Sequence, residues 1–311
     1  MVVPGQLRYI LGTDRASDGA GLIANPNTTV LIDQLVNADL CAQSLFDWHV
    51  SPAPGGPSPQ DHDPYAIKSM NLLLLSRGCG AARVALLEEN WCNNNLPRAL
   101  ADAVSSNALQ TLPDIVTLRT TSQCWSAAGH AEGCTEGHVL IGPQGYVAAQ
   151  APALVQRMIA ETHRPQVAPV VVTIEDHGWD GNLSAFAAWD PDGLPQPSLV
   201  IRIINPSNAS VTAVLNVSSL DSGFHVQDGT QFELRRLTSP LVGSEAFNWS
   251  EPETTGFNSL LNPDLISEEQ SWIPYVPLAP IQLPSYSFSV LVLPLSLSAG
   301  PTGLLTPRKM A

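Results

Sequence analysis

Two glutamates in succession, Glu88 and Glu89, end a short apolar run in the sequence RVALLEENW. The run from Val84 to Leu87 has the length and character of a strand that is buried on both faces. A carboxylate at the end of such a strand can serve as a nucleophile or as a general acid or base. The alternative is a carboxylate that only faces solvent, so the surrounding elements must decide between the two.

Two other groups of residues have the types that bind metal ions. Asp61, His62 and Asp63 stand together in a proline-rich segment, where a hydrated turn is the simpler interpretation. Cys124, His130, Cys134 and His138 match none of the usual zinc spacings. A disulfide between Cys124 and Cys134, or two free thiols, are the alternatives to a zinc site. We therefore expect no metal and no cofactor.

The elements that must position Glu88 alternate between strand and helix. Strands are predicted at Leu7–Leu11, Leu45–Val50, Val84–Leu87 and Asp114–Thr120, and helices at Thr29–Asn37, Tyr65–Arg77, Leu96–Leu109 and Pro152–His163. This order describes four βα units in series, and a barrel of this type needs eight. Because barrel strands point their C-terminal ends at the substrate, Glu88 is the first residue to suspect.

The pattern changes near Pro165. Short strands rich in Val, Ile and Leu follow, separated by turn residues; the clearest are LVIRIIN, VTAVLNV, FELRRL and YSFSVLVL. Such strands are typical of a jelly-roll-like antiparallel β-sandwich. The predicted fold is therefore α/β plus all-β: a partial (β/α)8 TIM barrel at 1–164, a sandwich at 165–298 and a disordered tail at 299–311.

The amino-acid composition limits the classes of molecule that the protein is expected to bind. The 311 residues carry a net charge of -14, and Lys68 and Lys309 are the only lysines. Nucleic acid and anionic membranes are poor partners for such a surface, whereas a neutral polysaccharide suits it. No apolar stretch reaches the roughly 20 residues of a membrane helix. Glycosylation sequons at Asn27, Asn182, Asn208, Asn216 and Asn248 favour a secreted or cell-wall protein, although the N-terminus has no signal-peptide pattern.

Several stretches resemble the glycoside hydrolase family 51 α-L-arabinofuranosidases. VALLEENW resembles the family's nucleophile strand, in which a glutamate ends an apolar run and asparagine follows. LPRALADAVSSNALQTLPDIVTLRTTSQ and VQRMIAETH resemble the segments after it. LVIRIINPSNASV, GFNSLLNPDLI and LPSYSFSVLVL resemble the family's C-terminal domain, in the same order.

The resemblance implies a retaining glycosidase with a (β/α)8 barrel and an appended β-sandwich. It makes Glu88 the nucleophile that forms a glycosyl-enzyme intermediate on arabinan-like or arabinoxylan-like polysaccharides. Candidate substrate-binding residues are His49, Asn90, Trp91 and Gln123. Trp48 and Trp125 are further candidates to stack on a sugar ring. A packed histidine, core tryptophans and an ordinary loop glutamine are the alternatives.

The resemblance also places the four units at strands five to eight of the barrel. The family's acid/base glutamate belongs to a Gly-Asn-Glu motif on strand four, and the chain contains no such motif. A truncated sequence, a second chain that supplies the missing half, and a loss of catalysis all explain this. The alternative function is a catalytically inactive carbohydrate-binding or interaction protein. Open strand edges at Leu7–Leu11 and Asp114–Thr120 predict self-association.

Overall fold

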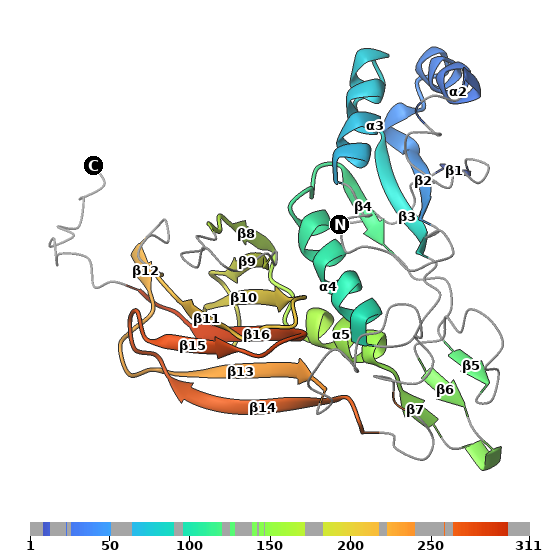
Figure 1. The fold of residues 1–311 in the computed structure, drawn as a ribbon. Coiled ribbons are helices and arrows are strands. Elements are labelled where there is room, and N and C mark those ends of the chain that lie inside the picture. Colours follow the sequence, from blue (N-terminus) through green and yellow to red (C-terminus); the bar gives the residue numbers. More distant parts are fainter. Residues whose placement is uncertain are drawn as a thin grey trace, which may run out of the picture.

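The structure is a computed structural model of the 311-residue chain. It describes residues 9–12, 23, 26–50, 64–89, 96–119, 125–127, 139–141, 143–145, 147–171, 183–217, 223–239, 258 and 264–297. A parallel sheet with its helices forms one lobe, and a larger antiparallel sheet forms the other (Figure 1). The expected tail at 299–311 lies outside the described residues.

Four parallel strands form the first sheet, in the order β1-β2-β3-β4. They are β1 (Tyr9–Gly12), β2 (Ser44–Val50), β3 (Arg83–Glu89) and β4 (Val116–Arg119). Their order and positions agree with the four βα units that the sequence predicts. The sheet is open, and the described residues form no closed barrel, so β1 and β4 are its two edges.

Four long helices lie in the described residues: α2 (Pro26–Asn37), α3 (Pro64–Ser76), α4 (Leu96–Gln110) and α5 (Ala151–Glu161). Two short 3-10 helices lie at Cys41–Gln43 and Pro143–Gly145. The helix α2 begins at Pro26, before the predicted start at Thr29, because proline suits the first helical turn. The helix α3 ends at Ser76, one residue before the predicted end at Arg77. Gly78 follows with a φ of 78°, and the N–H of Cys79 bonds to the carbonyl of Leu74 at 2.8 Å.

The core of the parallel lobe lies between the sheet and the helices α2 and α3. Phe46 of β2 and Val84 of β3 are 0% exposed and pack with Ile32 of α2 and Met70 and Leu74 of α3. Leu86 of β3 belongs to the same cluster. Alternate residues of β2 and β3 therefore face these helices, as a pleated strand requires.

The second lobe is built on a six-stranded antiparallel sheet in the order β14-β13-β16-β10-β9-β8. Its strands are β8 (Gln166–Ala168), β9 (Ser184–Asp190), β10 (Ser198–Asn205), β13 (Gln231–Thr238), β14 (Ser267–Pro274) and β16 (Ser287–Pro294). Two-stranded sheets pair β11 (Val211–Val214) with β15 (Pro280–Leu283), and β12 (Phe224–His225) with β17 (Ser296–Leu297). The four strands predicted most clearly correspond to β10, β11, β13 and β16, and β11 is shorter than VTAVLNV suggests.

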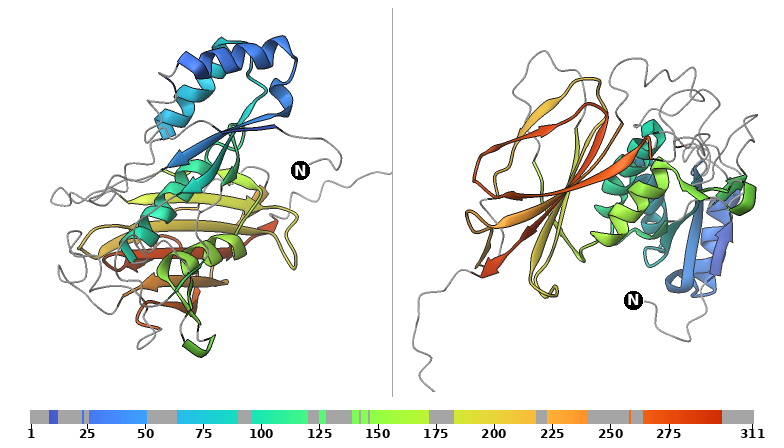
Figure 2. Two further views of the ribbon diagram at one scale, coloured as in Figure 1. Left: turned by 90° about the vertical axis from the view of Figure 1, so that its right-hand side faces the viewer. Right: turned by 90° about the horizontal axis from the view of Figure 1, so that it is seen from below.

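The large sheet is buried on both faces. In β10, Leu199, Ile201 and Ile203 join a core inside the antiparallel lobe. Val200 and Ile204 pack instead against α4 and α5. These two helices therefore lie between the lobes, as the two views in Figure 2 show. Burial on both sides explains why LVIRIIN is a continuous apolar run rather than an alternating one.

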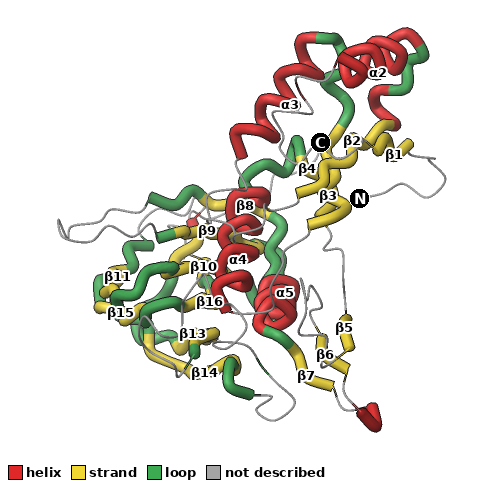
Figure 3. The backbone as a smooth tube through the Cα atoms, turned by 45° about the vertical axis from the view of Figure 1, so that its right-hand side comes forward, coloured by secondary structure: helices red, strands yellow, loops and turns green. Residues whose placement is uncertain are grey.

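A small third sheet joins β5 (Trp125–Ala127), β6 (Val139–Ile141) and β7 (Val147–Ala149). The sequence predicts only a long loop here. These strands are three residues each and are too short to leave an alternating pattern. Figure 3 shows this sheet beyond α5, at the end of the molecule opposite α2 and α3.

Ion pairs attach α5 to the antiparallel lobe. Glu268 of β14 accepts a hydrogen bond from Arg157 of α5 at 2.7 Å and another from Arg235 of β13. Arg235 also donates to Glu161 at the end of α5, at 2.6 Å. Burial alone would raise the pKa of Glu268, but the hydrogen bonds and charges of the two arginines outweigh it and hold that pKa below its ordinary value.

Candidate active site

The C-terminal ends of β2 and β3 bring two predicted site residues together. The strands pair in parallel, and the register places His49 directly beside Glu88 and Val50 beside Glu89. Neighbouring parallel strands lie about 4.8 Å apart, so the two backbones are adjacent at the rim of the sheet. The side chains of His49 and Glu88 lie outside the described part of the structure, and their roles stay predictions.

The pairing register of β2 and β3 shifts just before Glu88. Asp47 pairs with Ala85, but two residues later His49 pairs with Glu88, so β3 contains one extra residue between these pairs. Strict alternation would continue the row of Val84 and Leu86, which packs against α2 and α3. The extra residue interrupts this alternation before position 88. Irregularities of this kind are common beside active sites because they re-aim a side chain.

A buried carboxylate lies two positions before His49 in β2. Asp47 of β2 is 6% exposed, and it pairs with Ala85, which is 0% exposed. Two residues of strand separate Asp47 from His49, a rise of about 6.6 Å. The sequence reasoning did not single out Asp47, although an aspartate inside the apolar segment LFDWHV is a signal that could have found it. A buried carboxylate costs free energy unless it is hydrogen-bonded, which makes Asp47 a candidate positioning residue.

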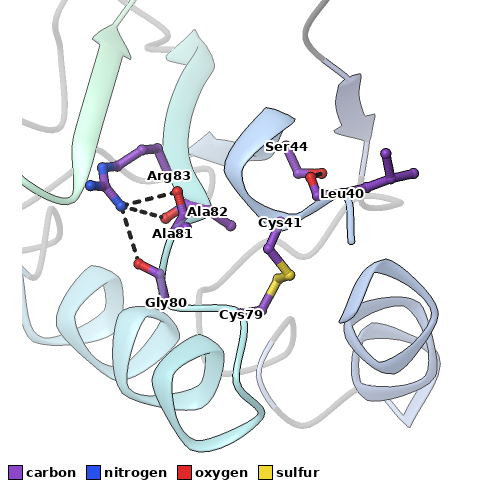
Figure 4. Close-up of a disulfide and its surroundings, with 8 residues drawn as sticks. All are labelled: Leu40, Cys41, Ser44, Cys79, Gly80, Ala81, Ala82 and Arg83. Atoms are coloured by element: carbon purple, nitrogen blue, oxygen red, sulfur yellow. Dashed lines mark hydrogen bonds between the residues drawn. A yellow bond between two sulfur atoms is a disulfide. The ribbon is translucent and has the colours of Figure 1, made fainter. Parts of the chain in front are cut away.

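A disulfide joins the segments that lead into β2 and β3. Cys41 and Cys79 are bonded, with 5.2 Å between their Cα atoms (Figure 4). Beside it, Arg83 Nη1 donates to the carbonyls of Gly80, Ala81 and Ala82 at 3.1 to 3.2 Å. This pairing was not predicted, since cysteine connectivity depends on which strands become neighbours. It fixes the starts of the two strands whose other ends carry His49 and Glu88.

The helix after Glu88 contains a buried ion pair. In the first turns of α4, Arg98 and Asp102 are 3% and 0% exposed, and Arg98 Nε lies 3.8 Å from Asp102 Oδ2. Both residues stand one turn apart on the same face of the helix. The pair links two successive turns of α4, close to the start of the helix at Leu96.

Several predictions fall on residues that the structure does not describe. Asn90, Trp91 and Gln123 are among them, and so are the possible metal groups at 61–63 and 124–138. Within the described ranges, no cluster of three or more His, Cys, Asp or Glu side chains could hold a metal ion. In the same part of the chain, no helix has the length and apolar character to cross a membrane.

The described parallel strands limit which carboxyl groups this candidate site could use. Among the four parallel strands, carboxylates occur on β2 and β3 alone, at Asp47, Glu88 and Glu89. A retaining glycosidase needs a second carboxyl group about 5 Å from its nucleophile. Glu89 pairs with Val50, next to the pair of His49 and Glu88, and Asp47 pairs with Ala85, further from the C-terminal end of β3.

Solved structures of arabinofuranosidases share this fold. A family 51 α-L-arabinofuranosidase from Bifidobacterium longum matches 93% of the chain, with a TM-score of 0.64 and 11% identity. An α-L-arabinofuranosidase from Thermotoga maritima, solved with arabinose, matches 92% with a TM-score of 0.58 and 14% identity. The chain spans 59% and 57% of these two proteins, a little over half of each. The resemblance drawn from the sequence is thus confirmed in the fold.

The same fold occurs in an enzyme with other substrates. A bifunctional glucanase-xylanase from a metagenome library matches 86% of the chain and 47% of its own length, with a TM-score of 0.52 and 17% identity. No protein-family model and no curated protein matches the sequence. The chain therefore shares its fold with solved glycoside hydrolases that act on different sugars.

Proposed function

We propose that this chain is the nucleophile-bearing part of a retaining glycoside hydrolase that removes terminal α-L-arabinofuranosyl residues from arabinan-like or arabinoxylan-like polysaccharides. The observation that carries the proposal is the register of β2 and β3, which sets Glu88 beside His49 at the C-terminal rim of the parallel sheet. Sugar-binding and catalytic groups of βα barrels gather at this rim. The fold shared with arabinofuranosidases supports the choice of sugar.

In this proposal Glu88 attacks the anomeric carbon, and the bond to the leaving oxygen breaks as the glycosyl ester forms. Water then hydrolyses the ester and releases the sugar with its original configuration. His49 and Asn90 hydrogen-bond the sugar hydroxyls beside Glu88. Trp91 stacks on the sugar ring, and Gln123 binds a hydroxyl from beyond β4.

A second carboxyl group must protonate the leaving oxygen and later activate water. The resemblance locates it in a Gly-Asn-Glu motif, which the chain lacks. We therefore propose that full turnover of polysaccharide requires a polypeptide that carries the first part of the barrel. The first chemical step can be tested without it, because an activated leaving group departs without a proton.

The test uses 2,4-dinitrophenyl α-L-arabinofuranoside, whose leaving group needs no acid. We expect one equivalent or less of dinitrophenol to be released, and the arabinosyl group to remain on the peptide that contains Glu88. Mass spectrometry of a digest locates the label. Glu88→Gln should abolish the labelling, whereas Glu89→Gln, the matched control one residue away, should retain it. A label elsewhere, or equal labelling of the Glu88→Gln variant, refutes the nucleophile assignment.

A catalytically inactive carbohydrate-binding protein is the second candidate. In that case the whole polypeptide has no Gly-Asn-Glu motif, as the given sequence has none, and no complete retaining site forms. Calorimetry with arabino-oligosaccharides separates the two proposals. Binding without any labelling at Glu88 supports the inactive protein, and labelling at Glu88 supports the hydrolase.

We also propose that the chain matures in an oxidising compartment and is secreted. The Cys41–Cys79 disulfide supports this, because such bonds persist mainly outside the cytosol. The sequon asparagines in the described ranges, Asn27, Asn208 and Asn216, are all exposed. Exposed acceptors are accessible to glycosylation.

A further inference from the structure

A cavity of about 550 Å³ lies between the two lobes. Its walls come from the last turn of α4, the start of β4, the end of α5, and the strands β8 and β9. Val116 in this wall pairs with Val84, at the opposite end of β3 from Glu88. The distance along the strand between those ends is about 13 Å. The cavity is therefore separate from the candidate active site.

The charges around this cavity are unexpected. The lining residues that the structure describes include Arg164 and His163 but no aspartate or glutamate, in a chain with 28 acidic residues and 14 lysines and arginines. Arg164 Nε donates to the hydroxyl of Ser198 at 2.7 Å, and its Nη1 donates to the carbonyl of His163 at 2.8 Å. Both acceptors are neutral. Among the described residues, no carboxylate pairs with Arg164.

A second guanidinium lies directly behind the wall. Arg202 of β10 is 0% exposed and donates to Gln110 Oε1 at 2.7 Å and to the carbonyl of Ile159 at 3.4 Å. It also lies 5.1 Å from the centre of the Phe186 ring. Gln110, Ile159 and Phe186 all line the cavity. Arg202 Nε has no hydrogen-bond acceptor in the described part of the chain, and no described carboxylate compensates its charge.

The fold leaves this positive charge only partly compensated. Burial first, and then the charge of Arg164, lowers the pKa of Arg202 to about 10. Burial and the charges of Arg202 and Arg164 lower the pKa of His163 as well. The C-terminal ends of α4 and α5 offset part of the charge, at about half a negative charge each. Two guanidinium groups exceed that, so an anion in the cavity would be stabilised.

We propose that this cavity binds a small organic anion of about monosaccharide size through its carboxylate. Arg164 supplies the charged donor. Gln156 also lines the cavity, and its buried Nε2 has no acceptor among the described residues, so a change of rotamer would offer a second donor. Leu109, Val167 and Phe186 provide apolar contacts for the body of the ligand. The volume lies within the range of small-ligand sites. The proposal does not depend on the hydrolase assignment.

The test is calorimetric titration of the full chain with galacturonate, a sugar that carries a carboxylate, and with galactose, its neutral counterpart. We expect galacturonate to bind at least about tenfold more tightly, the effect of one charge-assisted hydrogen bond. It should also raise the melting temperature, because a ligand that binds only the folded chain stabilises it. Equal binding of the two sugars, or no binding of galacturonate, overturns the proposal.

Variants locate the binding. Arg164→Gln should weaken galacturonate binding about tenfold or more, while Arg164→Lys, which keeps the charge, should restore part of it. Arg77→Gln is the matched control, since Arg77 is an exposed arginine paired with Asp33 far from the cavity. Circular dichroism of each variant shows whether it is folded. An unchanged affinity in folded Arg164→Gln, or an equal loss in Arg77→Gln, overturns the assignment.

Discussion

Without the Cys41–Cys79 disulfide, the parallel lobe should unfold locally far more easily. The two cysteines are 38 residues apart in sequence. In the chain-entropy model, closing a loop of this length stabilises the folded state by about 4 kcal/mol. Every 1.4 kcal/mol changes an equilibrium about tenfold, so the opening equilibrium of the lobe should rise about a thousandfold. The change is Cys41→Ala with Cys79→Ala; alanine avoids burying a hydroxyl at Cys79, which is 0% exposed.

Hydrogen exchange followed by mass spectrometry measures this opening lobe by lobe. Peptides from β2 and β3 should exchange about a thousandfold faster in the double variant, and peptides from β10 and β16 should exchange as before. Cys92→Ala is the control, because it removes a cysteine and leaves the Cys41–Cys79 pair. Labelling of Glu88 by the activated arabinoside should also slow, since the disulfide holds the strands that place Glu88 beside His49. Exchange that stays within about threefold of the parent in β2 and β3 would refute this reasoning.

Two other predictions concern the antiparallel lobe and the edge strand β4 of the parallel sheet. Glu268→Gln should cost about 2 kcal/mol of stability at pH 7, because the charged hydrogen bonds to Arg157 and Arg235 are lost. The pKa of Glu268 is lowered in the folded state, so this stabilisation is present above the ordinary glutamate pKa and is lost as pH falls through the lowered value. Melting curves of parent and variant should therefore converge at acid pH; a constant difference down to pH 3 would contradict the assignment. Leu118 is 43% exposed on the edge strand β4, and Leu118→Lys should reduce concentration-dependent association in light scattering. A parent protein that is monomeric at all concentrations would rule out association through this edge.

Local patterns were sufficient to predict the elements around the candidate site. The apolar run before Glu88 and the 3.6-residue period of Leu96–Leu109 mark β3 and α4 without any knowledge of the fold. Gly78 marks the end of α3, because only a glycine adopts its positive φ without strain. Short strands such as β5, β6 and β12 were not predicted, since two or three residues are too few to show an alternating pattern.

Contacts between distant residues were beyond such patterns. The amino-acid sequence alone determined that a glutamate ends a buried strand, that four βα units come first and that antiparallel strands follow. Only the tertiary structure decided that an extra residue in β3 shifts the register so that Glu88 pairs with His49, that Cys41 meets Cys79, and that Arg202 is enclosed between helices and sheet. The reason is physical: period and propensity act over a few neighbouring residues, whereas register, pairing and charge compensation depend on which segments the folded core brings together.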